Sequence, residues 1–190
     1  SVEKLVTKAV NDGYKTLVIA GGDSALNDAV NSLMRMEIHQ RDNVMLGVIP
    51  NGIMNDFAAY WGLTYNNVEK SIRSIVERRV TTLCIGSAWG YGQTPNATPY
   101  SGMLDVTVVR STLLMQHIEA IFFFLIGRLL NSKRILPYRT RSIRILSDKR
   151  LPVTVDGHPL KEQIRTMTVD IEPEVINFII EESEKSKKSQ

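Results

Sequence analysis

The sequence predicts an α/β domain built on a parallel sheet, followed by a mostly β second domain. Two strand–loop–helix units in tandem predict the first domain, because apolar runs at 14–20 and 44–49 each lead into a glycine-containing loop and a helical pattern. Both loops are then expected at the carboxyl edge of one sheet. Short β-like segments separated by turn residues after position 80 predict the second domain.

The elements of the first domain follow from the spacing of its apolar residues. In order, they are helix 1–12, strand 14–20, helix 25–36, strand 44–49, a helix opening at 55–61 and helix 68–79. The last helix is expected to turn one face inward, formed by Val68, Ile72, Ile75 and Val76.

The composition changes near Val80, where we place the domain boundary. The predicted domains are residues 1–79, residues 80–180 and a charged tail at 181–190. The second domain is expected to hold strands at 80–85, 104–109, 141–146, 151–155, 166–171 and 175–180, and a strongly apolar helix at 113–130.

Composition narrows the class of protein. Hydrophobic residues make up 43% of the 190 residues, which predicts a packed core. The formal net charge of +3 gives no reason to expect a nucleic-acid partner. The single cysteine, Cys84, excludes an internal disulfide and fits a reducing compartment. With no signal-peptide pattern at the start, a cytoplasmic location is expected.

The first loop, Gly21-Gly22-Asp23, combines features of an anion site. Glycines let the backbone approach a ligand closely, and the following helix start offers N–H groups to a phosphate. Asp23 stands at the strand end, where it could accept a proton or reach metal-bound phosphates. The alternative is a plain turn between a strand and a helix.

The second loop repeats this arrangement. Pro50 stops the strand, Gly52 follows, and Asn55-Asp56 precede a helix. Asp56 is the better candidate for a Mg²⁺ ligand, because hard cations prefer carboxylates. The alternative is that Asn55 and Asp56 only cap the helix, as these residue types often do.

Four motifs in order resemble the diacylglycerol kinase catalytic domain family, which includes sphingosine kinases and bacterial lipid kinases. They lie at Gly21–Asp28, Ile49–Ala58, Ser101–Val106 and Val155–His158. The resemblance implies an NAD-kinase-like nucleotide-binding α/β domain and a β-sandwich domain. It also implies ATP as phosphate donor, Mg²⁺, and transfer of the γ-phosphate to a lipid hydroxyl such as that of diacylglycerol.

The resemblance also suggests site residues. Asp23 is the expected general base, and His158 stands where the family has a catalytic glutamate, although an exposed turn histidine is the alternative. Asp56 is the expected metal ligand. The residues expected to bind the nucleotide are Gly21, Gly22, Ser24, Asn27, Gly52 and Asn55.

Several positions depart from the family pattern. Ser24 and Ala25 replace a glycine and a threonine, and Ile53-Met54 replace Thr-x, which removes a hydroxyl from the second loop. These changes favour a relative that binds nucleotide or lipid without transfer. A further alternative is an NAD-kinase-like enzyme with a soluble acceptor. The family's first strand–loop–helix unit, with its Asn-Pro loop, is not in this sequence.

An apolar helix followed by basic residues favours a lipid acceptor. Residues 113–130 are apolar around most of the expected helix, and basic residues gather between Lys133 and Arg150. This pair predicts a peripheral contact with the inner face of a membrane, where cations meet anionic headgroups. The alternative is a helix buried in the core of the second domain. The sequence leaves open whether the protein forms a homo-oligomer.

Overall fold

The computed structural model of the chain describes residues 1–85, 101–109, 135–155 and 158–180. The chain divides into two compact units. In the described residues, the first unit holds 1–85 and 173–180, and the second holds 101–172. We describe each unit by itself.

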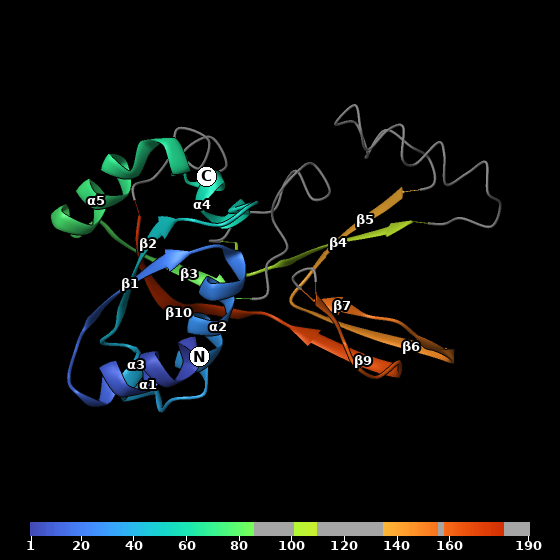
Figure 1. The fold of residues 1–190 in the computed structure, drawn as a ribbon. Coiled ribbons are helices and arrows are strands. Elements are labelled where there is room, and N and C mark those ends of the chain that lie inside the picture. Colours follow the sequence, from blue (N-terminus) through green and yellow to red (C-terminus); the bar gives the residue numbers. More distant parts are fainter. Residues whose placement is uncertain (86–100, 110–134, 156–157, 181–190) are drawn as a thin grey trace. The chain divides into compact units, whose positions relative to one another are not determined.

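The first unit is built on a four-stranded sheet in the order β1-β2-β10-β3 (Figure 1). Its strands are β1 (Thr16–Gly21), β2 (Met45–Pro50), β10 (Glu172–Ile179) and β3 (Val80–Ile85). β1 and β10 both pair with β2 in parallel. At the carboxyl end of the first pair, Gly21 lies opposite Pro50. The predicted parallel α/β arrangement is therefore confirmed.

The helices of the first unit lie close to their predicted positions. They are α1 (Val2–Asn11), α2 (Asp23–Met34), α3 (Ile38–Arg41), α4 (Asp56–Tyr60) and α5 (Val68–Glu77), with a 3₁₀ turn η1 at Tyr65–Asn67. α3 and η1 were not predicted, because a single turn leaves little periodicity to detect. α2 begins at Asp23, two residues before its predicted start, so Asp23 and Ser24 belong to the helix.

One hydrophobic core joins α1, α2 and α4 to the sheet. α1 and α2 pack together, and the buried side chains of α2 meet Leu46 and Val48 of β2. Trp61, directly after α4, is 0% exposed and belongs to the same core. The core members from α2, α4 and β10 are Leu26, Ala29, Leu33, Ala58, Ile176 and Phe178.

The inward face of α5 differs from the prediction. Ile72 and Val76 are exposed, and the buried residues of the helix are Ser71 and Ser74. Small serines let a helix approach a sheet closely. Gly47 of β2 accommodates the approach, since a Cβ there would lie 2.9 Å from Cγ1 of Ile75.

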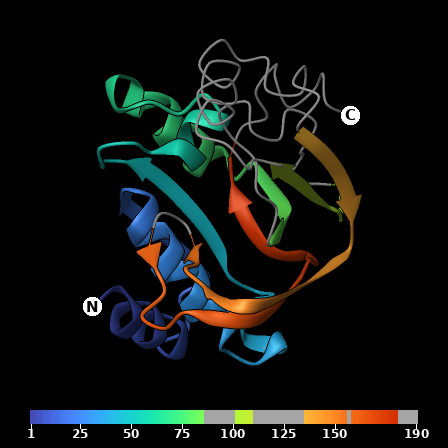
Figure 2. The same ribbon diagram turned by 90° about the vertical axis from the view of Figure 1, so that its right-hand side faces the viewer.

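The predicted second domain, residues 80–180, differs from the second unit of the structure at both of its ends. β3 and β10 both belong to the sheet of the first unit, where they lie side by side (Figure 2). Periodicity identified each strand but not its partner. β10 returns to the first unit because its apolar residues, Ile176 and Phe178 among them, complete that unit's core.

The second unit is mostly β, as predicted. Its antiparallel pairs are β4 (Leu104–Val109) with β5 (Ile135–Thr140), β6 (Ser142–Leu151) with β9 (Ile164–Asp170), and β7 (Thr154–Val155) with β8 (His158–Pro159). β5 was not predicted. The apolar segment 113–130 and the tail 181–190 lie outside the described residues. Among those described, no helix is long and apolar enough to cross a membrane.

Candidate functional site

The two predicted loops meet at the carboxyl edge of the sheet. β1 ends at Gly21 and its neighbour β2 ends at Pro50. Just beyond these ends, the Asn51 N–H donates a 3.0 Å hydrogen bond to the carbonyl oxygen of Gly21. The loops are therefore joined through their backbones from the point where the strands stop.

Gly22 and Gly52 hold the loops in direct backbone contact. A Cβ added to Gly22 would lie 3.1 Å from the Gly52 Cα, and one added to Gly52 would overlap the Gly22 Cα. Only residues without a side chain allow this approach. The two glycines predicted to contact a phosphate thus first serve to bring two segments of backbone together.

Asn55 closes the second loop with its own side chain. Its Oδ1 accepts a 2.8 Å hydrogen bond from the Gly52 N–H, and its Nδ2 donates to the Gly52 carbonyl oxygen at 2.7 Å. Asn55 is 9% exposed and adopts the left-handed conformation, with φ of 53°, that asparagine tolerates better than most residues. The predicted nucleotide-binding asparagine therefore fixes the shape of the loop.

Asp23 links the first loop to the helix that follows the second. Its Oδ2 accepts a 2.8 Å hydrogen bond from the Asp56 N–H, and its Oδ1 accepts from the Phe57 N–H at 3.1 Å. The alternative, that Asn55 and Asp56 only cap α4 with their own side chains, is therefore wrong. The carboxylate that caps α4 comes from the other loop, since the side chain of Asn55 is directed to Gly52.

Ser24 and Asn27 lie along α2. Ser24 is exposed at the second position of the helix, where the backbone conformation suits any L-residue. The serine in place of the family glycine therefore introduces no backbone strain. Asn27 lies one turn further, and its Oδ1 accepts a 2.8 Å hydrogen bond from Nδ2 of Asn31. Their predicted nucleotide contacts stay predictions.

The described residues fit a Mg²⁺ ion only in a limited way. Asp56 is exposed at the start of α4, directly after the second loop. No group of three histidine, cysteine or acidic side chains converges among the residues that the structure describes. Mg²⁺ is commonly held by one or two carboxylates together with waters and substrate phosphates. A single carboxylate at Asp56 is compatible with that mode and not with an all-protein cage.

Helix α4 carries the aromatic residues behind the loops. The ring of Phe57 lies 4.8 Å from that of Phe178 of β10, and Tyr60 meets Trp61 edge to face at 5.0 Å. Burial raises the pKa of the Tyr60 hydroxyl above its ordinary value. The contact of Phe57 with Phe178 anchors the start of α4, which follows the second loop, and the contact of Tyr60 with Trp61 anchors its other end.

His158 belongs to the second unit, in β8, where it pairs with Val155. Its side chain lies outside the described residues, so its predicted catalytic role stays a prediction. Of the basic residues expected to meet a membrane, Arg139 lies 3.8 Å from the carboxylate of Asp105 on the opposite strand. The exposed ones on and beside β6 are Arg141, Arg144, Lys149 and Arg150.

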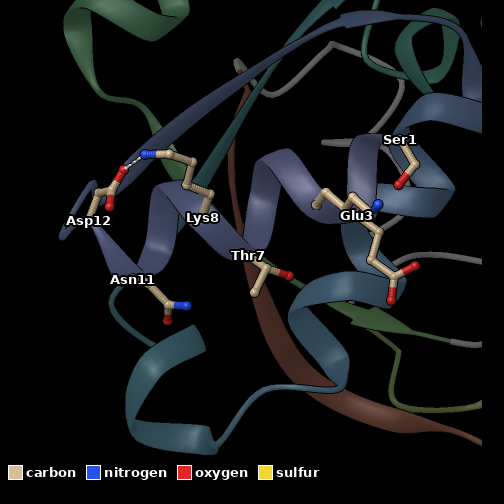
Figure 3. A pocket seen from close by; sticks show the side chains of 7 residues that line it. Ser1, Glu3, Thr7, Lys8, Asn11 and Asp12 are labelled. Carbon is tan, nitrogen blue, oxygen red and sulfur yellow. Dashed lines mark hydrogen bonds and ion pairs between the residues drawn. The ribbon is translucent and has the colours of Figure 1, made fainter.

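A shallow pocket lies elsewhere, along the exposed side of α1 (Figure 3). An ion pair between Lys8 and Asp12 lies at one end of it. None of the predicted site residues lines this pocket, whose other lining residues are Ser1, Glu3, Lys4, Thr7 and Asn11. The candidate site is therefore the pair of loops, which sequence reasoning found, although it missed the bond between them through Asp23.

Comparisons with known proteins agree with this site. Residues 1–88 match the family model described as the diacylglycerol kinase catalytic domain. The chain is 39% identical over 61 residues to "Probable lipid kinase YegS-like" of Shewanella frigidimarina, an alignment covering 32% of this chain and 19% of that protein. It is 33% identical over 79 residues to a diacylglycerol kinase of Staphylococcus aureus, covering 42% of this chain and 24% of that protein.

The fold is also similar to that of a solved structure. A crystal structure of a diacylglycerol kinase from Bacillus anthracis matches with a TM-score of 0.70 and 16% identity, covering 95% of this chain and 81% of that one. At this identity the likeness supports the fold. The alignments with the curated relatives span a quarter or less of their length. The similarity to the diacylglycerol kinase catalytic domain family therefore rests on residues 1–88, which hold both glycine loops.

Proposed function

We propose that the two joined loops bind the phosphates of ATP and that the protein transfers the γ-phosphate to a lipid hydroxyl, with diacylglycerol as the first candidate acceptor. The observation that carries the proposal is the backbone contact between Gly22 and Gly52 at the sheet edge, beside the start of α2. Backbone N–H groups in such a loop, and the first N–H groups of a helix, suit phosphate oxygens.

The chemistry asks mainly for positioning and charge stabilisation. The loops hold the phosphates, and α2, with 12 residues, adds the positive end of its dipole. Asp56 is the residue that would hold Mg²⁺, which neutralises phosphate charge when bound. The acceptor hydroxyl must lose its proton, and Asp23 and His158 are the groups that the resemblance nominates for this step.

A lipid acceptor is supported by the family and by the charge of the second unit. Arg141, Arg144 and Lys149 are exposed, so they can meet anionic headgroups at a membrane surface. We therefore propose that the protein contacts the inner face of a membrane peripherally, from the cytoplasm, where it finds its substrate.

The nucleotide is tested first. Isothermal titration calorimetry is expected to show Mg-ADP binding with a Kd between about 1 µM and 1 mM, the range typical of enzyme substrates. Asn11→Ala, in the shallow pocket on α1, is the control and should bind as the parent does. Undetectable binding at millimolar Mg-ADP contradicts the proposal, and a loss of binding in Asn11→Ala moves the site to that pocket.

Transfer is tested separately, because one observation favours a relative that binds nucleotide without reaction. Ile53 is 100% exposed at the position where the family has a threonine hydroxyl. Radiolabelled ATP with mixed vesicles containing diacylglycerol is expected to yield labelled lipid, and Ile53→Thr is expected to raise the rate by restoring a phosphate contact. Nucleotide binding without label in any lipid of a panel, in both proteins, selects the non-catalytic alternative.

A further inference from the structure

We infer that Asp23 is a positioning residue that locks the two glycine loops together by capping α4 from across the site. The lock is this juxtaposition: Asp23 begins α2 after the first loop, and the N–H groups that it binds begin α4 after the second. The inference rests on the proposed function, because the spacing of the loops matters to a ligand that both must hold.

Helix α4 has no cap of its own. Asn55 stands at its N-cap position with φ of 53° and ψ of 43°, whereas a capping residue usually has an extended conformation. No side-chain bond joins Asn55 to the helix, because its Oδ1 and Nδ2 both bind Gly52. The side chain of Asn55 thus closes the loop and does not cap the helix. The first N–H groups of α4 bind an acceptor from another segment instead.

The carboxylate of Asp23 fills that need with both of its oxygens. The two hydrogen bonds, of 2.8 Å to the Asp56 N–H and 3.1 Å to the Phe57 N–H, have ordinary lengths. Asp23 can make them only if its own loop lies against the second, and this is the arrangement that the contact between Gly22 and Gly52 provides. The cap and the glycine contact therefore support each other.

The capped helix end is itself fixed by the core. Phe57, whose N–H is bound by Asp23, packs its ring against that of Phe178, and Ala58 is buried. Asp23 thus ties the first loop to a point held by packing, and the spacing between Gly22 and Gly52 is set before any ligand arrives. Preorganisation of this kind raises affinity, since binding then pays less for ordering the loops.

The lock can be separated from a general-base role. A base must take a proton from the acceptor hydroxyl, whereas a cap needs only oxygens that accept from N–H groups. Asp23→Asn keeps the shape of the side chain but offers a single acceptor oxygen. Its NH₂ group would face one of the two α4 N–H groups, donor against donor.

The experiment measures amide hydrogen exchange and nucleotide affinity in Asp23→Asn. We expect roughly tenfold faster exchange at the N–H groups of Asp56 and Phe57 and roughly tenfold weaker Mg-ADP binding, as for loss of a helix cap. The KM for ATP should rise while kcat at saturating ATP is mostly retained. Asp148→Asn, the same charge change at an exposed site of the second unit, should leave all four quantities unchanged.

Three outcomes decide against the lock. Exchange and affinity equal to those of the parent overturn it, and a roughly hundredfold lower kcat with both unchanged assigns Asp23 to general-base catalysis instead. Faster exchange with unchanged affinity overturns the link to the nucleotide. If the parent itself does not bind Mg-ADP, the proposed function fails, and the exchange measurement still tests the cap.

A second variant covers the case in which Asp23→Asn does not fold. Asp23→Glu keeps two acceptor oxygens and is expected to retain more exchange protection and more Mg-ADP affinity than Asp23→Ala. The reverse order overturns the lock, because a carboxylate that cannot restore the bonds is then not what holds α4.

Discussion

Gly52→Ala is expected to lose at least roughly a hundredfold in Mg-ADP affinity, because the two loops can no longer lie in contact. The new Cβ would overlap the Gly22 Cα and lie 2.9 Å from Asn55 Oδ1 and 3.0 Å from the Gly22 nitrogen. Two of these neighbours are backbone atoms, which cannot rotate away as the end of a side chain can. Calorimetry gives the affinity, and urea unfolding should show a loss of about 1–3 kcal/mol, typical of overpacking.

Two glycine variants serve as controls. Gly22→Ala should have a smaller effect, because its Cβ would meet the Gly52 Cα at 3.1 Å, which a small backbone shift relieves. Gly13→Ala has open space but a φ of +88°, so it should lose about 1 kcal/mol of stability and no affinity. Parent-like Mg-ADP binding by Gly52→Ala would show that the loop contact is irrelevant to the nucleotide.

Trp61→Ala is expected to lower the free energy of unfolding of the first unit by about 3–5 kcal/mol. Trp61 is 0% exposed and packs edge to face against Tyr60, at 5.0 Å between ring centroids. Its removal leaves a large cavity directly behind α4, the helix that Asp23 caps. Urea unfolding followed by circular dichroism measures the change, and Mg-ADP affinity should fall with it as the α4 end loosens.

Tyr65→Ala is the matched control. Tyr65 is an aromatic residue four positions further along, but it is 65% exposed. Its removal should change the stability by no more than about 0.5 kcal/mol, as is usual for surface positions. A loss of under 1 kcal/mol in Trp61→Ala would mean that Trp61 does not hold α4 in place.

The order of elements in the first unit could be predicted from the sequence, because each element carries its own periodicity. The strands that end at Gly21 and Pro50 were found within two residues at each end. The loops could be predicted in the same way, because glycine and proline mark the ends of strands locally. Both glycines of the loop contact and both acids of the site can therefore be identified from the sequence.

The membership of the sheet could not be predicted in this way. β10 lies more than 120 positions from β2 in the chain and still pairs with it in parallel. Its apolar alternation says that it is a strand with a buried face, but not which sheet covers that face. Helix α5 shows the same limit. The apolar pattern predicted that Ile72 and Val76 are buried, but they are exposed, and the serines of the helix are buried instead.

The sequence by itself determined the parallel α/β unit, the β-rich second unit, the two glycine loops and the resemblance of residues 1–88 to the kinase family model, since each depends on patterns within a short stretch. Only the tertiary structure decided what Asp23 does. Its hydrogen bonds to Asp56 and Phe57 join residues 33 and 34 positions apart. A residue's type shows what it can bind, but its partner depends on which segments the packing brings together. At this site, two glycines without side chains bring the carboxylate of one loop to the helix of the other.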